Sequence, residues 1–469
     1  MGIPVITVEQ MRRWEAASWE AGRREEEVIA QVGKLLARRV MELTKPGDAV
    51  FILAGKGNNG ADARAVEPHL IERRVWVLKV VEPLRALDKI KELLKRGPAL
   101  VIDGLFGIGL NRDLTPDWCA VIDAVNESGC RVLSVDTPSG LDAQTGEVRG
   151  AAVRAGWTMT LGAPKVGLIE GKAAPYVGRL EVVPEIGLVG CEEASDLEWI
   201  TKEGFSGFPP KRPVEGHKGT FGHVTVLGGS LGYHGAAVLA ARAAQRAMPG
   251  LVTLCVPESV YVTVASQLQS VMVHPWRAGW TLPASNTAVV IGPGMVTEGV
   301  PEELREFAID IWRTSKCPVI VDASALGWLP TGPVDGEATR VITPHPGEAA
   351  RMLNWTTGQV QGKRGEALKE LSARWGRAWV VLKGRHTLVG RAAGKVLVNG
   401  SGNVGLAQGG SGDVLAGYLG GLLAQPKLQE DVLKTISYGV WQHGAAADAL
   451  AEERKIWSVE EVLPWMGAI

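Results

Sequence analysis

The chain has 469 residues, with 50 Lys and Arg against 51 Asp and Glu, so its formal net charge is -1. This balance excludes a broad basic surface of the kind that binds nucleic acid or acidic membranes. Glycine and proline make up about 18% of the chain, which is below the level of disordered low-complexity sequences and suits an enzyme with many loops. The length predicts two or three domains.

The sequence carries no signal for export or membrane insertion. The opening MGIPVITVEQMRRWEAA lacks the apolar segment of a secretion signal, and no run of about 18 apolar residues is found along the chain. The five cysteines lie far apart without a CxxC pair, which indicates neither a zinc site nor a disulfide framework. We therefore expect a cytoplasmic protein.

Short apolar runs that alternate with helical stretches predict the strands. A first series occupies residues 49–55, 75–81, 99–104 and 131–136, and a second occupies residues 223–229, 250–257, 288–294, 318–323, 340–347 and 379–384. Apolar runs without alternation, separated by helices, indicate parallel strands that are buried on both faces. The predicted fold class is therefore α/β.

A polar segment separates the two series of predicted strands. Residues 187–219 carry three prolines and show no sustained helix or strand pattern. We place the boundary there, with one domain over residues 1–204 and a second over residues 205–469. The halves share no obvious motif, so the chain reads as a fusion rather than as a duplication.

The predicted strands of the first half end in polar, glycine-rich loops. One strand leads into a Gly/Asn turn at residues 55–60, another ends at Asp103, and a third ends at Asp136, close to Ser139. The loops at the carboxyl ends of parallel strands meet at one edge of the sheet, where ligands bind. Taken singly, the turn is equally consistent with a plain strand-to-helix connection, and each aspartate is better explained by a helix cap or turn.

GKGNNGAD, DGLFGIGLNR, VDTPSGLDAQTG and LGAPKVGL follow one another within residues 3–190 and together resemble the NAD(P)H-hydrate epimerase domain. The resemblance implies a Rossmann-like, three-layer αβα domain that interconverts the R and S epimers of hydrated NADH and NADPH. It implies Asp136 as the acid–base residue and a potassium ion (K⁺) held by Asn59, Asp103 and Ser139. The implied substrate-binding residues are Gly57, Asn58, Gly60, Asp62, Gly107, Ile108, Gly109, Leu110, Asn111, Arg112 and Asp136.

The first half also departs from the family's pattern. Ala61 and Ala63 replace glycines, Gln31 and Val32 replace other family residues, and Glu15 stands where an Asp is usual. A second hypothesis therefore stays open, in which the first half is a degenerate binding or oligomerisation module and only the second half is catalytic. We also expect a homo-oligomer, with no nucleic-acid or membrane partner.

In the second half, NGSGNVGLAQGGSGDVLAG places a run of glycines before Asp413 and an apolar helix. Backbone N–H groups at the start of a helix favour anions such as phosphate, and an aspartate there can deprotonate a hydroxyl group. An aspartate that only caps the helix gives the same pattern, so the spacing leaves both roles open. His345, between two prolines, and Lys383, at a strand end, also have purely structural alternatives.

HKGTFGHVTVLGGS, TPHPGE and GNVGLAQGGSGD lie in this order within residues 205–460 and resemble the ADP-dependent NAD(P)H-hydrate dehydratase family. The resemblance implies a ribokinase-like α/β domain that uses ADP with Mg²⁺ to convert the S hydrate to NAD(P)H, AMP and phosphate, with Asp413 as the base. A ribokinase-type small-molecule kinase is the less favoured alternative, because TPHPGE together with GGSGD points to the dehydratase branch.

The same resemblance implies two sets of ligand contacts, and this sequence departs from the family pattern in one segment. The implied contacts are Ala236, Gly294, His345 and Asp413 for the hydrated nucleotide, and Lys383, Gly384, Arg385, His386, Thr387 and Gly412 for the adenine nucleotide. Ser324 and Gly327 replace an acidic residue and an asparagine of the family pattern.

Overall fold

The computed structural model describes residues 2–468 and divides into two compact units. The N-terminal unit comprises residues 3–196, and the C-terminal unit comprises Gly2 and the residues from Leu197 onward. The division therefore precedes the boundary that the sequence suggests after residue 204. The reason is a short strand, β8 (Leu197–Ile200), which lies within the polar segment and pairs with the sheet of the C-terminal unit.

One parallel sheet forms the centre of the N-terminal unit, with the strand order β3-β2-β4-β5-β6-β7. The first four of its strands in the chain match predicted apolar runs. The last two lie outside these runs, because Thr, Arg and Glu interrupt their apolar pattern. The strands are β2 (Ala49–Ala54), β3 (Arg74–Lys79), β4 (Leu100–Gly104), β5 (Val132–Val135), β6 (Trp157–Leu161) and β7 (Arg179–Val183).

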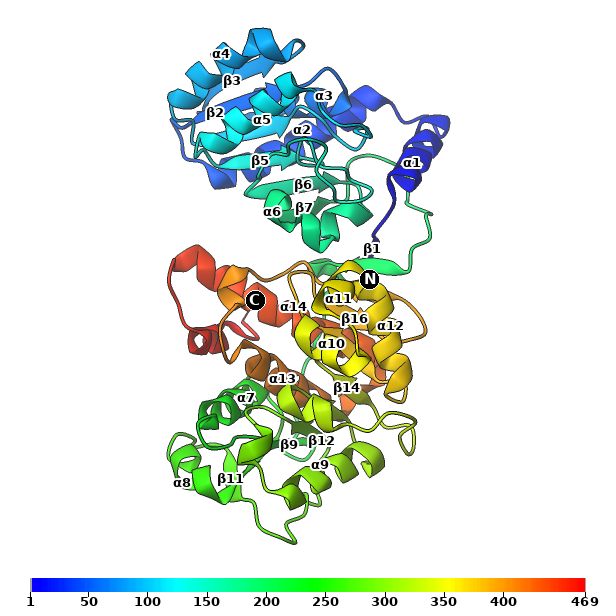
Figure 1. Ribbon diagram of the computed structural model, residues 1–469, viewed down its shortest axis with the longest axis vertical. Helices are drawn as coiled ribbons and strands as arrows, with labels where there is room; N and C mark the ends of the chain where they lie inside the picture. The colour runs from blue at the N-terminus through cyan, green and yellow to red at the C-terminus, as the bar shows by residue number, and fades with distance from the viewer. Residues whose placement is uncertain (1, 469) are drawn as a thin grey trace. The chain divides into compact units, whose positions relative to one another are not determined.

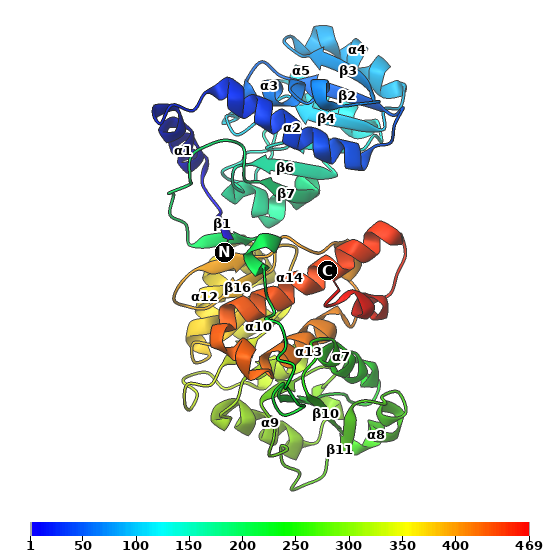
Figure 2. The ribbon, with the colours of Figure 1, turned by 180° about the vertical axis from the view of Figure 1, so that it is seen from behind.

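Helices cover both faces of this sheet and complete three layers. The helices are α1 (Val8–Glu20), α2 (Glu25–Leu43), α3 (Asn58–Arg64), α4 (Pro83–Lys95), α5 (Pro116–Glu127) and α6 (Ala174–Val177). Val50 and Ile52 of β2 share a core with side chains of α1 and α2, while Phe51 and Leu53 share a second core with α4 and α5. Figure 1 shows α4 and α5 on one face, and Figure 2 shows α2 across the other. The predicted αβα arrangement is confirmed.

The C-terminal unit also has one central sheet. Its strand order is β1-β8-β17-β16-β15-β14-β13-β12-β9-β10-β11. The strands are β1 (Gly2–Pro4), β8, β9 (His223–Leu227), β10 (Leu251–Val256), β11 (Met272–Pro275), β12 (Ala288–Ile291), β13 (Val319–Val321), β14 (Arg340–Ile342), β15 (Trp379–Leu382), β16 (Leu388–Gly390) and β17 (Val396–Val398). The six predicted strands are parallel, but β16 runs antiparallel to both of its neighbours.

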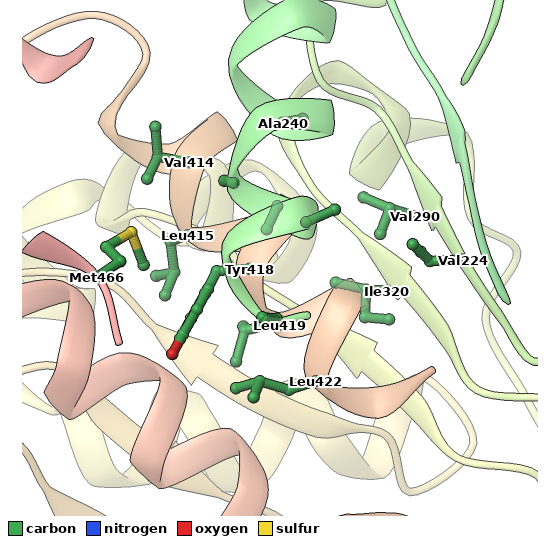
Figure 3. Close-up of a cluster of buried hydrophobic side chains, with 14 of the residues drawn as sticks. Val224, Ala240, Val290, Ile320, Val414, Leu415, Tyr418, Leu419, Leu422 and Met466 are labelled. Atoms are coloured by element: carbon green, nitrogen blue, oxygen red, sulfur yellow. The ribbon is translucent and has the colours of Figure 1, made fainter. Parts of the chain in front are cut away.

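The helices of the C-terminal unit pack on this sheet. They are α7 (His234–Arg246), α8 (Glu258–Ala265), α9 (Glu302–Thr314), α10 (Pro346–Leu353), α11 (Thr357–Gly362), α12 (Arg364–Arg374), α13 (Ser411–Leu423) and α14 (Val432–Glu453). Leu419 and Tyr418 of α13 share a buried core with Val224 and Val290 of the sheet and Ala240 of α7, as Figure 3 shows.

Glycine positions bring α13 close to its neighbours. A Cβ atom on Gly417 would lie 2.0 Å from the carbonyl O of Ala240, and one on Gly420 would lie 2.1 Å from Cγ2 of Val290. Only glycine allows this close approach of α13 to α7 and β12. The packing fixes the direction of α13, and it therefore fixes where the glycine-rich start of the helix and Asp413 lie.

Candidate active sites

A cavity of about 580 Å³ lies at the carboxyl ends of the central strands of the N-terminal unit. The loops after β2, β4 and β5 contribute to its lining, together with side chains of α1 and α2. The predicted residues that line it are Gly57, Asn58, Asn59, Asp62, Gly107, Ile108, Gly109, Leu110, Asn111, Arg112 and Asp136. The other three predicted residues, Gly60, Asp103 and Ser139, are buried and do not line the cavity.

Gly60 shapes the turn after β2. A Cβ atom on Gly60 would lie 2.2 Å from the carbonyl O of Gly55, so a side chain at this position would push α3 away from the strand. The residue therefore acts through backbone packing, which brings Asn58 and Asn59 to the cavity, rather than by contacting a ligand itself.

Asp136 lies directly after β5 with a positive φ of 62°, a backbone conformation that non-glycine residues adopt rarely. Its Oδ1 accepts hydrogen bonds from the backbone N–H of Leu161 at 3.0 Å, from Lys165 Nζ at 2.5 Å and from Thr160 Oγ1 at 3.3 Å. Within residues 2–468 no donor reaches Oδ2. This second oxygen is therefore the one left for a ligand in the cavity.

Lys165 is a residue of this site that the sequence interpretation missed. Its side chain is fully buried, and Nζ also donates to the carbonyl O of Leu161 at 2.7 Å. A buried ammonium group is tolerated only when it is paired, and here the partner is Asp136. The only signal in the sequence is a lysine within the mostly apolar segment LGAPKVGL, where a solvent-exposed turn is the ordinary expectation.

Asp103, Ser139 and Asn59 form a buried polar cluster beside the cavity. Ser139 donates to Asp103 through its hydroxyl group, at 2.5 Å from Oδ1, and through its N–H, at 2.9 Å from Oδ2. Asn59 Nδ2 donates to the carbonyl O of Phe106 at 2.7 Å, whereas the buried Asn59 Oδ1 has no hydrogen-bond partner. An unsatisfied buried oxygen near a carboxylate and a hydroxyl group is the kind of donor set that a hard cation takes. These residues therefore fit a potassium ion.

Three further carboxyl groups, those of Asp62, Glu15 and Glu25, line the same cavity. Burial, with smaller contributions from the carboxylates of Asp136 and Glu15, raises the pKa of Asp62 to about 8. Burial also raises the pKa of Glu15. Asp62 therefore carries a proton at neutral pH, in a cavity whose buried ammonium is bonded to Asp136.

The departures from the family's pattern leave the cavity open. Ala61, Ala63 and Gln31 are not among its lining residues, and Val32 contributes an apolar wall. Ala63 is fully buried and faces Gly104, where an added Cβ atom would lie 2.4 Å from the Ala63 methyl group. The alanine fits because its neighbour has no side chain, so the substitution changes helix packing rather than the site.

The candidate site of the C-terminal unit lies at the carboxyl ends of β13–β15 and the start of α13. Lys383 Nζ donates to Oδ1 of Asp322 at 2.6 Å and lies 3.8 Å from Oε2 of Glu348. A Cβ atom on Gly412 would lie 3.2 Å from Lys383 Nζ and 3.4 Å from Asp322 Oδ2. Thus Asp413, which follows Gly412, stands at the edge of a buried charged pair.

Burial and neighbouring charges shift the pKa values of Asp413 and Lys383 in this cluster. Burial and the carboxylate of Asp322 raise the pKa of Asp413 to about 7, while the ammonium of Lys383 opposes the shift. Although burial lowers the pKa of Lys383, the carboxylates of Asp322 and Glu348 raise it overall. A base with a pKa near the working pH removes and returns protons efficiently. Asp413 therefore has the properties of a general base.

Asp322 is the residue of this cluster that the sequence interpretation left out. It directly follows β13, and Thr343 Oγ1 also donates to its Oδ1 at 2.7 Å. The signal was present, because an aspartate ends the apolar run of residues 318–323. Ser324 and Gly327, the departures of this segment, are exposed, whereas Asp322 is buried and keeps its contacts.

His345 begins α10 as its N-terminal cap. Nδ1 accepts from the N–H of Gly347 at 3.0 Å and from the N–H of Glu348 at 3.3 Å. Burial lowers the pKa of His345, so the ring stays neutral at pH 7. The half-exposed ring thus has a structural role through Nδ1, and Nε2, 3.6 Å from Oε1 of Glu348, points to no closer partner within residues 2–468.

Ala236 and Gly294 lie next to each other on the other side of the predicted site. Gly294 has a φ of +68°, and an added Cβ atom would lie 2.4 Å from the carbonyl O of Tyr233 and 2.9 Å from the Ala236 Cβ. Ser230 Oγ donates to the carbonyl O of Gly294 at 2.7 Å. Ala236 and Gly294 are therefore neighbours, and the position of Gly294 admits only glycine.

The predicted nucleotide segment, residues 383–387, is a tight loop after β15. Gly384 has a φ of +149°, and Thr387 Oγ1 donates to its carbonyl O at 3.0 Å. The guanidinium group of Arg364 donates to the carbonyl O of His386 at 3.0 Å and holds the loop from α12. The His386 ring is buried edge-on against Trp199, so it supports the loop, while Gly384 and Arg385 are exposed.

Within residues 2–468, no group of three or more His, Cys, Asp or Glu side chains is arranged to hold a metal ion. No helix in this part of the chain is long and apolar enough to cross a membrane.

Both units hold acidic groups beside buried lysines at the carboxyl ends of parallel strands, which defines an α/β enzyme with two separate sites. The family model described as NAD(P)H-hydrate dehydratase matches residues 224–463, and the one described as YjeF-related protein N-terminus matches residues 78–167. The bifunctional NAD(P)H-hydrate repair enzyme of Coxiella burnetii is 33% identical over 95% of this chain and 94% of its own length. The bifunctional NAD(P)H-hydrate repair enzyme of Gloeobacter violaceus is 34% identical over 99% of this chain and 98% of its own length. The chain belongs to the family of bifunctional NAD(P)H-hydrate repair enzymes.

Solved structures agree with this assignment for the C-terminal unit. The ADP/ATP-dependent NAD(P)H-hydrate dehydratase of Bacillus subtilis, co-crystallised with ATP and Mg²⁺, is 32% identical, with a TM-score of 0.51 over 57% of this chain and 95% of that one. A ribokinase-like superfamily protein of Enterococcus faecalis, 22% identical with a TM-score of 0.51, shares the fold. The predicted ribokinase-like class is therefore confirmed.

Proposed function

We propose that this chain repairs hydrated NADH and NADPH in two steps. The N-terminal unit interconverts the R and S hydrates, and the C-terminal unit dehydrates the S hydrate with ADP. The observation that carries the proposal is that each unit has its own site with a carboxylate under the influence of a lysine ammonium group. Asp136 is ion-paired with Lys165 in one unit, and Asp413 has its pKa set by burial, Asp322 and Lys383 in the other. Two sites that use one metabolite in succession explain why the units share a chain.

In the N-terminal unit, Asp136 acts as the acid–base residue of epimerisation. Its Oδ1 is occupied by Lys165 and Leu161, so Oδ2 exchanges the proton of the substrate's ring hydroxyl group. The residues of the loop at 107–112 and the start of α3 hold the nucleotide against the cavity. Potassium would be held by Asn59 Oδ1, Asp103 and Ser139, and it would supply a fixed positive charge beside the substrate.

In the C-terminal unit, Asp413 removes the proton of the ring hydroxyl group of the S hydrate. The resulting oxygen attacks the terminal phosphorus of ADP, and AMP leaves. Phosphate then leaves the ring carbon as a proton is lost from the neighbouring carbon, which restores the dihydronicotinamide double bond. Hydroxide is a poor leaving group and phosphate a good one, which explains the need for ADP.

The remaining predicted contacts keep their roles in this proposal. Ala236, Gly294 and His345 Nε2 face the hydrated nucleotide, while Lys383, the loop at 384–387 and the N–H of Gly412 face the phosphates of ADP. The N–H groups at the start of α13 favour negative charge on those phosphates. Mg²⁺, bound with the nucleotide, would neutralise part of the phosphate charge.

One assay tests the proposal. The protein is incubated with a mixture of R and S NADH hydrates and ADP, and the absorbance of NADH is followed. Conversion of both hydrates, faster than spontaneous epimerisation allows, is the expected result. Conversion that stops at the S fraction would contradict the role of the N-terminal unit. Phosphate transfer to another alcohol without NADH formation would favour a small-molecule kinase instead.

A cytoplasmic location and a homo-oligomeric state complete the proposal. The support for the location is the five cysteines, which include no CxxC pair and are all free thiols in the structure. Cell fractionation tests the location, and light scattering coupled to size-exclusion chromatography tests the oligomeric state.

A further inference from the structure

The cavity of the N-terminal unit contains more carboxyl groups than its buried cation can balance. Asp62 comes from α3, Glu15 from α1 and Asp136 from the end of β5, and all three line the cavity. Lys165, the fully buried lysine beside them, is bonded to Asp136. Asp62 is only 9% exposed, and within residues 2–468 its carboxyl group has neither a hydrogen bond nor an ion pair.

An unpartnered carboxylate in such a place is unfavourable, so Asp62 holds a proton. Burial has the largest effect, and the carboxylates of Asp136, Glu15 and Glu25 add to it, while Lys165 opposes it. Together these raise the pKa of Asp62 to about 8. The other charged side chains that line the cavity are Glu25, Arg12, Lys56 and Arg112.

We propose that Asp62 is a second acid–base residue of epimerisation, which donates a proton to the substrate while Asp136 accepts one. This inference rests on the proposed function of the N-terminal unit. It gives Asp62 a role in the reaction beyond the substrate contact that the family resemblance implies. Two neighbouring carboxyl groups, one paired with an ammonium and one not, provide a base and an acid at the same pH.

The chemistry of the hydrate needs both groups. The carbon that bears the ring hydroxyl group is also bonded to the ring nitrogen. Asp136 takes the hydroxyl proton as the carbon–nitrogen bond breaks, the bond's electron pair goes to nitrogen, and Asp62 gives nitrogen its proton. The product is an open-chain aldehyde. Rotation about the adjacent carbon–carbon bond and the reverse proton transfers close the ring with the opposite configuration, and both carboxyl groups return to their starting states.

The first test replaces Asp62 by asparagine, which keeps the shape but cannot carry the proton. We expect D62N to slow R-to-S conversion by about 100-fold or more, the usual contribution of a general acid. Dehydration of the S hydrate by the other unit of the same chain should be unchanged, which confines the effect to the N-terminal unit, and protection of the β2 and β4 amides from hydrogen exchange should show that this unit is folded. D123N is the matched control, because Asp123 is an exposed carboxyl group on α5, and it should keep full epimerase activity.

The second test is the pH profile of epimerisation. The wild-type rate should fall as the pH rises through about 8, because Asp62 then loses its proton, and this alkaline limb should be absent in D62N. A D62N variant that keeps the wild-type rate, or that shows the same alkaline limb, would overturn the inference while leaving the proposed function intact. A wild-type protein that does not accelerate R-to-S conversion would overturn both.

Discussion

Lys383 Nζ lies 2.6 Å from Oδ1 of Asp322, although 61 residues separate them in the chain. This contact joins the carboxyl ends of β13 and β15 directly beneath the start of α13. It places one positive and one negative charge next to Asp413, the proposed base of dehydration. The properties of this base are therefore set by a pair that the fold, and not the local sequence, brings together.

The first prediction concerns Asp413 itself. Asp413→Asn should lower the rate of dehydration by at least about 100-fold, because the amide cannot accept the proton of the ring hydroxyl group. Binding of ADP, measured by calorimetry, should be unchanged, since the N–H groups of the helix start remain. Near-normal turnover of the variant would show that Asp413 is not the base.

The second prediction concerns the pH dependence of dehydration. The pKa of Asp413 is raised to about 7, and the base acts only when it is ionised, so the rate should rise with pH through about 7 and then level off. Asp322→Asn removes a carboxylate that raises this pKa, so the acid limb should move to lower pH. Lys383→Met should move it to higher pH. Acid limbs that coincide in all three proteins would contradict the coupling.

Apolar runs were sufficient to predict the central strands, because strands buried on both faces are mostly apolar. Two short strands were not predicted: β8 carries Glu198 and pairs with the distant β17, and β16 has three residues and pairs with its chain neighbours β15 and β17. The site residues were likewise predictable from the sequence only where a local motif marks them. Asp136 and Asp413 lie in recognisable motifs, whereas Lys165 and Asp322 owe their importance to contacts across the sheet.

The third prediction tests how closely phosphate must approach the start of α13. Gly412→Ala adds a methyl group 3.2 Å from Lys383 Nζ, the flexible end of a side chain, so folding should tolerate it. We expect the KM for ADP to rise about tenfold, equivalent to about 1.4 kcal/mol of binding free energy. Gly365→Ala is the matched control, because Gly365 has the same second position in α12 and no atom within 4 Å of an added Cβ. Equal kinetics for both variants would contradict the role of Gly412.

The fourth prediction concerns potassium. Replacing potassium with choline in the buffer should slow epimerisation and leave dehydration unchanged, because only the N-terminal unit has the unsatisfied Asn59 Oδ1 beside Asp103 and Ser139. Asn59→Ala should make the remaining epimerase rate independent of the cation. Equal rates for the wild-type protein in both buffers would show that this cluster is only structural.

The fifth prediction concerns stability and follows from the proton on Asp62. The folded state keeps this proton up to a pH of about 8, while in the unfolded chain the carboxyl group has its ordinary pKa of 3.8. Between these values the unfolded state binds fewer protons, so the free energy of unfolding of the N-terminal unit falls as the pH rises.

Asp62→Asn removes this dependence. The variant should therefore become progressively more stable than the wild-type protein from a pH of about 4 to a pH of about 8, with a constant difference above that. Hydrogen exchange of the β2 and β4 amides measures the effect within the N-terminal unit, and exchange of the β9 amides serves as the internal control. If Asp62 is kept for catalysis, its replacement should make the protein more stable while epimerase activity is lost. If Asp62 is kept for packing, its replacement should make the protein less stable. A difference that does not change with pH would mean that Asp62 is ionised in the folded protein.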